Sequence, residues 1–291
     1  MNPWRAHFVA ADVEPDSAPL FRRDFDLDPG HGPVESAILT LSALGICEAW
    51  INGRPASDSL LTPGWTSYEW RLHYVEHDVT SLIETRSTLT IAVGNGWYRG
   101  RLGWIETRRY GDDLAAFAQL RLRFADGHEQ YVATDESWTV GPSEITADDF
   151  YDGQTIDARR RDDRAKLPGF NDPAWGRVRL LPHPRVRFEL DPAPPVRRVD
   201  ELPATKIWRS PTGAVMVDFG ENIVGFVRIR VRGERGNLLT VRHAEVLEDG
   251  ELAGHRTNIR HSICTRKRTF APPAREPSVR RSGRGRRAAS G

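Results

Sequence analysis

The sequence predicts an all-β protein with two consecutive domains of the β-sandwich or jelly-roll kind. Short runs rich in Val, Ile, Leu, Thr and Phe follow one another along the chain, and several alternate apolar with polar residues. Gly, Asn, Asp and Pro separate these runs, as they do between strands. No long stretch shows the periodicity of an amphipathic helix.

The first predicted domain covers residues 18–184 and follows an N-terminal extension of residues 1–17. Phe117–Phe124 (FAQLRLRF) alternates strictly, as a half-buried strand should, and Asp126-Gly127 then turns the chain back. Asn52-Gly53 is a tight-hairpin signal of the same kind. The other strands expected in this domain are Ser36–Ala43, Gly45–Ile51, Thr88–Val93 and Gln130–Thr134.

A proline-rich stretch marks the predicted domain boundary. The five prolines from Pro182 to Pro195 are too many for an internal strand, so residues 185–195 are expected to form an extended linker. A second β-domain is then expected to span residues 196–262. Its expected strands are Ala214–Phe219, Gly225–Val231 and Leu238–His243.

Residues 263–291 differ in composition from the rest of the chain, because Arg, Pro, Ser, Gly and Ala dominate them. Such a segment buries too little apolar surface to offset chain entropy, so we expect a disordered basic tail. From His255 onward there are eleven Lys and Arg against one acidic residue, which leaves a net charge of −9 on residues 1–254. An acidic body does not attract phosphate groups, so nucleic acid is not expected as a partner.

The composition is that of an ordinary soluble protein with no membrane partner. No apolar run is long enough for a membrane helix, and no secretory signal follows Met1. The two cysteines, Cys47 and Cys264, cannot form a disulfide framework. A cytoplasmic location is therefore expected.

Three aromatic clusters are candidates for sugar binding, because flat rings stack on the apolar face of a sugar and carboxylates bind its hydroxyls. They lie at residues 63–70 (PGWTSYEW), 94–104 (GNGWYRGRLGW) and 147–154 (ADDFYDGQ). Trp97, Tyr98 and Arg99 follow a Gly-Asn-Gly turn at a strand end, where binding loops lie. Tyr151 and Asp152 lie in a second turn, which supplies a carboxylate. The alternative for the tryptophan is a place in the core, where most sandwich tryptophans lie.

The acidic side chains offer no clear catalytic or metal site. Asp148, Asp149, Asp152 and Asp157 provide oxygen ligands of the kind Ca²⁺ prefers, but their spacing is not that of an EF-hand, and a solvated acidic turn is favoured. The string at residues 161–164 (RDDR) is equally well explained as a charged surface turn.

Several ordered motifs resemble those of bacterial α-L-rhamnosidases. The likeness covers residues 4–262. It is carried by residues 49–54 (AWINGR), 61–68 (LTPGWTSY), 78–80 (DVT), 96–100 (GWYRG), 151–154 (YDGQ), 157–159 (DAR), 217–222 (VDFGEN) and 242–252 (RHAEVLEDGEL). The resemblance implies a glycoside hydrolase that releases terminal α-L-rhamnose with inversion, and hence rhamnose-containing glycosides as partners. It also implies that the second domain, residues 196–262, is a β-domain of concanavalin-like type that is truncated here. Ca²⁺ is implied as a cofactor of some members, with ligands that stay unassigned in this sequence.

The chemistry of that family belongs to an (α/α)₆ barrel that follows these β-domains, and its acidic motif is not found in this sequence. No catalytic residue is therefore assigned, and the chain is expected to be inactive alone. Past Ser262 the likeness gives way to an Arg-rich sequence typical of a GC-rich gene read out of frame, so we expect a frameshift. The alternatives are a free-standing lectin-like module and, least favoured, a nucleic-acid binder that uses the basic tail.

Overall fold

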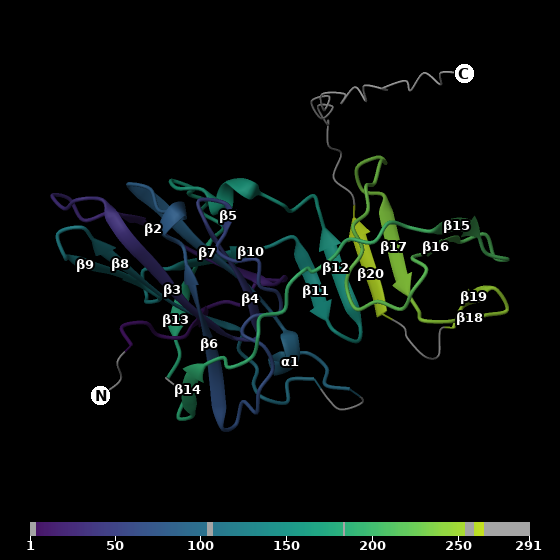
Figure 1. Cartoon of the computed structure of the whole chain (residues 1–291), viewed down its shortest axis with the longest axis horizontal. Helices are drawn as coiled ribbons and strands as arrows, with labels where there is room; N and C mark the ends of the chain where they lie inside the picture. The colour runs from purple at the N-terminus through teal and green to yellow at the C-terminus, as the bar shows by residue number, and fades with distance from the viewer. Residues whose placement is uncertain (1–3, 104–106, 183, 254–258, 265–291) are drawn as a thin grey trace, which may run out of the picture.

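The computed structural model describes residues 4–103, 107–182, 184–253 and, for the backbone alone, 259–264. Its regular secondary structure is almost entirely β-strand (Figure 1). The strands that form the first body are β1 (Val9–Ala11), β2 (Pro19–Asp26), β3 (Val34–Leu44), β4 (Ile46–Ile51), β5 (Arg54–Pro55), β6 (Arg71–Asp78), β7 (Arg86–Gly94), β8 (Ala115–Phe124), β9 (Glu129–Ala133), β10 (Thr139–Pro142), β13 (Gly176–Leu180) and β14 (Arg187–Leu190). The helical pieces are short: η1 (Thr80–Leu82), α1 (Gly96–Arg99) and η2 (Asp163–Lys166).

The first body is a two-layer sandwich, as expected. One layer has the order β14-β6-β3-β8-β1, with β9 beside β8, and the other has the order β10-β2-β7-β4-β5. Strand β13 pairs with β1 in one layer and with β10 in the other, so it joins the two. The core between the layers contains apolar residues of β3 and β8 from one side and of β2, β4 and β7 from the other.

Strand β8 shows how the sequence pattern selects the faces. Its residues Ala116, Ala118, Leu120, Leu122 and Phe124 enter the core, which is the alternation expected from the sequence. At its N-terminal end Ala115 and Phe117 face the other way and join a second apolar cluster on the outer side of the layer. The turn between β4 and β5 is also as predicted, since Asn52 and Gly53 have φ values of 52° and 75°.

The segment predicted as a linker contains a strand. Residues Arg187–Leu190 form β14, which pairs in parallel with β6 at the edge of the sheet. The prolines that suggested a linker flank this strand and are absent from it, and an edge strand tolerates them there. Phe188 packs in the outer apolar cluster, with its ring centroid 4.9 Å from that of Phe117. The extended linker therefore does not span residues 185–195 as expected.

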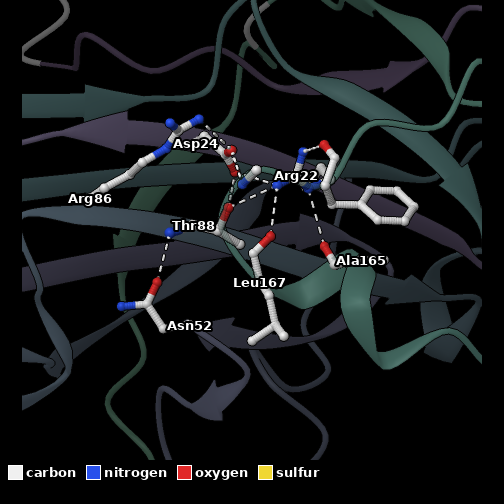
Figure 2. A network of polar contacts seen from close by, with 9 residues as sticks. Arg22, Asp24, Asn52, Arg86, Thr88, Ala165 and Leu167 are labelled. Atoms are coloured by element: carbon white, nitrogen blue, oxygen red, sulfur yellow. Dashed lines mark hydrogen bonds and ion pairs between the residues drawn. The ribbon is translucent and has the colours of Figure 1, made fainter.

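Segment 163–170 is fastened to the sandwich by one buried arginine (Figure 2). Arg22 of β2 is only 7% exposed, and its guanidinium forms an ion pair with Asp24. It donates hydrogen bonds to the carbonyls of Ala165 at 3.1 Å, Leu167 at 3.2 Å and Phe170 at 2.8 Å. The short helix η2 and the loop that follows it are thereby held against the outside of a strand.

The later strands form small sheets beside the sandwich. They are β11 (Ile145–Asp149), β12 (Gly153–Asp157), β15 (Lys206–Arg209), β16 (Val215–Asp218), β17 (Leu238–His243), β18 (Leu247–Glu248), β19 (Glu251–Leu252) and β20 (Ile259–Cys264). The hairpin β11–β12 lies within the first predicted domain, yet it forms one sheet with strands of the second, in the order β11-β12-β20-β17 (Figure 1). The expected strand Gly225–Val231 is wrong, because that segment has no regular structure.

Residues 199–247 expose many large apolar side chains, among them Val199, Ile207, Val224, Phe226 and Leu238. The predicted tail lies outside the described residues from position 265 onward. Among the described residues, no helix is long and apolar enough to cross a membrane.

Candidate functional site

Two of the clusters singled out in the sequence meet in space. Helix α1 carries Trp97, Tyr98 and Arg99, and the hairpin β11–β12 carries Tyr151 and Asp152 at its turn. Asp148 joins the two elements, because its carboxylate accepts a hydrogen bond from the Asn95 backbone N–H at 2.6 Å. The Asn95 side chain in turn donates to the Asp148 carbonyl at 2.7 Å. Burial raises the pKa of Asp148, and the backbone hydrogen bond from Asn95 opposes that shift.

Asp149 shapes the hairpin turn. Its carboxylate accepts backbone hydrogen bonds from Tyr151 at 2.7 Å and Asp152 at 3.0 Å, so it fixes the two candidate residues. It also accepts the backbone N–H of Arg101 at 2.6 Å, which lies just past α1. The Asp149 carboxylate thus connects the segment after α1 to the turn of the hairpin β11–β12.

The aromatic residues of α1 serve mainly in packing. Tyr98 is buried, and its ring centroid lies 5.2 Å from that of Tyr68. The expectation that it binds sugar stays a prediction. Trp97 is half-buried against Phe150, with centroids 4.6 Å apart. The alternative position in the core, expected for the tryptophan, thus applies to Trp97 only in part, whereas Tyr98 is buried.

Arg99 is also engaged, because it forms an ion pair with Glu14 and its side chain is 11% exposed. The side chain is therefore held by the segment before β2. The expectation that Arg99 binds sugar stays a prediction.

The exposed part of the site consists of Arg101, Tyr151 and Asp152, which we call the Tyr151 patch. Tyr151 is 44% exposed, and the Arg101 guanidinium lies 5.7 Å from its ring centroid. Arg101 also forms an ion pair with Asp152, while its Nε atom is buried without a hydrogen-bond partner. The patch thus offers a flat ring, a carboxylate and a cation side by side, which is the chemistry that binds a hydroxylated ring.

Two members of the assembled site, Arg101 and Phe150, lie within the predicted clusters but are not singled out there as sugar-binding residues. Arg101 lies 51 positions from its partner Asp152. Phe150 directly precedes Tyr151 and carries no signal of its own. Two other tryptophans, Trp65 and Trp70, are exposed, at 56% and 77%. No periodicity in the sequence distinguishes these from the half-buried Trp97.

The acidic cluster does not fit a Ca²⁺ ion. Asp148 and Asp149 accept backbone hydrogen bonds, and Asp152 pairs with Arg101. Hydrogen bonds from Arg159 hold the pKa of Asp157 at about 2, which marks it as a salt-bridged carboxylate. Across residues 4–103, 107–182 and 184–253, no group of three or more His, Cys, Asp or Glu side chains is arranged to hold a metal.

The charged string at residues 161–164 is a surface turn. Arg161 pairs with Asp163, and Arg164 pairs with Asp162, which also caps η2. Both carboxylates are therefore taken by neighbouring guanidinium groups. This geometry does not resemble a pair of carboxylates flanking a glycosidic bond.

Two family descriptions match the chain one after the other. The "Alpha-L-rhamnosidase N-terminal domain" matches residues 32–200. The "Bacterial alpha-L-rhamnosidase concanavalin-like domain" matches residues 208–286. The second match runs past Ser262, where we expected the likeness to end, so that expectation is corrected.

Curated relatives and solved structures agree with these matches. An α-L-rhamnosidase of Streptomyces avermitilis is 36% identical over 91% of this chain and 25% of its own length, and one of Alteromonas sp. is 29% identical over 85% and 28%. The native α-L-rhamnosidase structure from Aspergillus terreus has a TM-score of 0.84 at 34% identity, covering 89% of this chain and 31% of that one. The Streptomyces avermitilis enzyme complexed with L-rhamnose has a TM-score of 0.82 at 34% identity, covering 89% and 25%.

The chain spans about a quarter of the length of the curated relatives it matches. Its matches are the β-rich N-terminal and concanavalin-like domains, which agree with the observed strands. The chain belongs to the α-L-rhamnosidase family.

Proposed function

We propose that this chain is the substrate-recognising β-part of an α-L-rhamnosidase and that the Tyr151 patch contacts rhamnose-containing glycosides. The observation that carries the proposal is the meeting of exposed Tyr151, Asp152 and Arg101, which Asp149 holds in one place. Family membership supplies the sugar class, since a relative was solved with L-rhamnose. A cytoplasmic location stays a prediction, because it rests on the sequence alone.

Hydrolysis is not assigned to this chain. Glycosidases of most families place two carboxyl groups on either side of the scissile bond, one as acid and one as base or nucleophile. The aspartates of segments 148–152 and 161–164 are engaged with guanidinium or backbone N–H groups, so none of them is placed for that role. We expect purified chain to release no p-nitrophenol from p-nitrophenyl α-L-rhamnoside.

Binding of methyl α-L-rhamnoside to the whole chain, followed by titration calorimetry, tests the recognition role. Asp152→Ala removes a charged acceptor, which contributes about 1.5–3 kcal/mol, so affinity should fall about tenfold or more. Tyr151→Ala should weaken binding by a smaller factor, because stacking contributes about 1 kcal/mol. Glu136→Ala is the matched control, since Glu136 is an exposed carboxylate outside the patch.

The free-standing lectin-like module is the second candidate, and the patch would serve it equally well. In this alternative the Trp97 and Asp152 regions bind rhamnosides without serving a catalytic domain. Strong and selective binding of rhamnosides by the chain on a glycan array would favour it. If Asp152→Ala and Glu136→Ala bind as the unaltered chain does, the patch has no part in recognition.

A further inference from the structure

A cavity of about 110 Å³ lies at the edge of the sandwich, away from α1 and the hairpin β11–β12. It is bordered by β4, by the loop of residues 55–62 and by the end of β6. Its buried lining is mostly apolar: it includes Leu41, Ala49 and Ala56, with Thr62 as a buried polar residue. Its more exposed lining is polar and includes Asp58, His77 and Arg198. We call this space the β4 cavity.

Hydrogen bonds at both ends of the loop hold the cavity open. The Ala56 backbone N–H donates to the Ala49 carbonyl at 2.9 Å, and that of Cys47 donates to the Thr62 carbonyl at 2.7 Å. Between these two anchors the chain bulges away from β4. Within the bulge the hydroxyls of Ser57 and Ser59 bond each other at 2.9 Å. The bulge is thus a fixed piece of structure and provides one wall.

A strap of residues 196–198 provides another wall. The Leu60 backbone N–H donates to the Val196 carbonyl at 2.8 Å, and Arg197 forms an ion pair with Asp58 at 3.0 Å. The next residue, Arg198, lines the cavity itself. The strap leads from the sandwich toward β15, so the cavity lies where the first body connects to the following strands.

The lining has the chemistry of a small sugar site. The cavity is smaller than the roughly 150 Å³ apolar cavity that accepts benzene, so it admits one edge of a pyranose and leaves the rest at the polar mouth. Burial lowers the pKa of His77, which keeps the imidazole neutral, and a neutral imidazole has one donor and one acceptor for hydroxyls. Asp58 and Arg198 add an acceptor and a donor beside it.

We propose that the β4 cavity is a second sugar subsite, which takes the methyl group of a 6-deoxyhexose against Leu41, Ala49 and Ala56 and binds the ring hydroxyls with Asp58, His77 and Arg198. The subsite shares no residue with the Tyr151 patch. The choice of L-rhamnose as the probe rests on the proposed function. A bound sugar contacts Arg198 and Asp58 together and therefore orders the strap.

The test combines two sugars and two readouts on the full chain. L-Mannose has a hydroxymethyl group where L-rhamnose has a methyl group, so the apolar lining should bind L-mannose about tenfold more weakly. Binding is measured by titration calorimetry. The second readout is the rate of trypsin cleavage after Arg197 and Arg198, which saturating L-rhamnose should slow at least threefold while leaving cleavage after other exposed arginines unchanged.

Ala56→Met fills the cavity from its apolar side and should abolish the slowing of strap cleavage. Ala174→Met is the matched control, since Ala174 is exposed and lies outside the lining. His77→Phe keeps an aromatic ring but removes the two nitrogens that would bind hydroxyls. It replaces Ala56→Met as the test variant if Ala56→Met does not fold. Its expected effect is at least a fivefold loss of affinity.

The outcomes separate the two sites. Strap protection that survives Tyr151→Ala and disappears with Ala56→Met or His77→Phe supports the β4 cavity. Sugar binding that depends on Tyr151 alone, with no change in strap cleavage, overturns the cavity and leaves the proposed function intact. No binding of L-rhamnose to the folded chain overturns both.

Discussion

Arg22 is the residue on which a whole surface segment depends. Its guanidinium satisfies three carbonyls between Ala165 and Phe170, as well as the Asp24 carboxylate and the Thr88 hydroxyl (Figure 2). A buried arginine is a good choice for this task, because its five N–H groups point in fixed directions from one plane. Without it, the carbonyls would be left without these donors and the Asp24 carboxylate without its closest charged partner.

Arg22→Met should therefore be strongly destabilising. Breaking a buried ion pair by removing one partner costs about 3–5 kcal/mol, and most of that loss should appear in urea unfolding. Amide hydrogen exchange of residues 163–170 should accelerate even under native conditions. The control is Arg86→Met, because Arg86 pairs with the same Asp24 at 3.5 Å but has a side chain that is 58% exposed. A loss of less than about 1 kcal/mol is expected there, and equal losses in the two variants would contradict the role given to Arg22.

At the scale of single elements, the strands with local signals were predictable. Phe117–Phe124 alternates and becomes β8, Leu238–His243 becomes β17, and the Asn52-Gly53 turn needs the positive φ values that it has. Strand β14 was not predictable, because it pairs with β6 more than a hundred residues earlier and has only four residues. The prolines around it are a strong local signal, but the pairing that decides the outcome is long-range.

The candidate site divides in the same way. Turns with Gly and aromatic residues marked the segments of Trp97 and Tyr151, and the structure brings them together. The sequence could not tell which rings face outward, since that depends on the packing of α1 over Tyr68. Arg101 carries no local signal, because only the fold places it beside Asp152.

Strand β14 should contribute to the stability of the sandwich, as a flexible linker would not. Phe188→Ala removes a half-buried ring that packs against Phe117 at 4.9 Å and Tyr74 at 5.1 Å. Full burial of such a ring is worth about 3–5 kcal/mol, so we expect a loss of about 2 kcal/mol in the free energy of unfolding. Leu190→Ala is the control, because Leu190 is 53% exposed and should change stability by less than about 0.5 kcal/mol. Equal free energies of unfolding for the two variants would contradict a stabilising role of β14 and would favour a linker at residues 187–190.

For the molecule as a whole, the contrast between its two parts is the main feature. The sandwich has a core with buried residues from both layers, whereas residues 199–247 expose much of their apolar surface. Among the described strands, β17 lies at the edge of its sheet and pairs only with β20. Free edges and exposed apolar side chains favour association between chains.

Limited proteolysis should therefore leave a resistant core that ends after β14. Cleavage is expected between residues 192 and 205, which are largely exposed, and not before Arg187, because β14 is part of the sheet.

The same contrast predicts that a chain shortened to end at Asp191 aggregates less than the full chain, because it lacks the exposed residues 199–247. Mass spectrometry of the trypsin-resistant product would identify the cleavage site. Light scattering of the full and the shortened chain would compare their aggregation. The shortened chain also loses β20, which pairs with β12, so its hairpin β11–β12 should exchange amide protons faster while β3, β7 and β8 stay protected. Equal protease resistance along the full chain, or stronger aggregation of the shortened one, would show that residues 199–247 are as firmly packed as the sandwich.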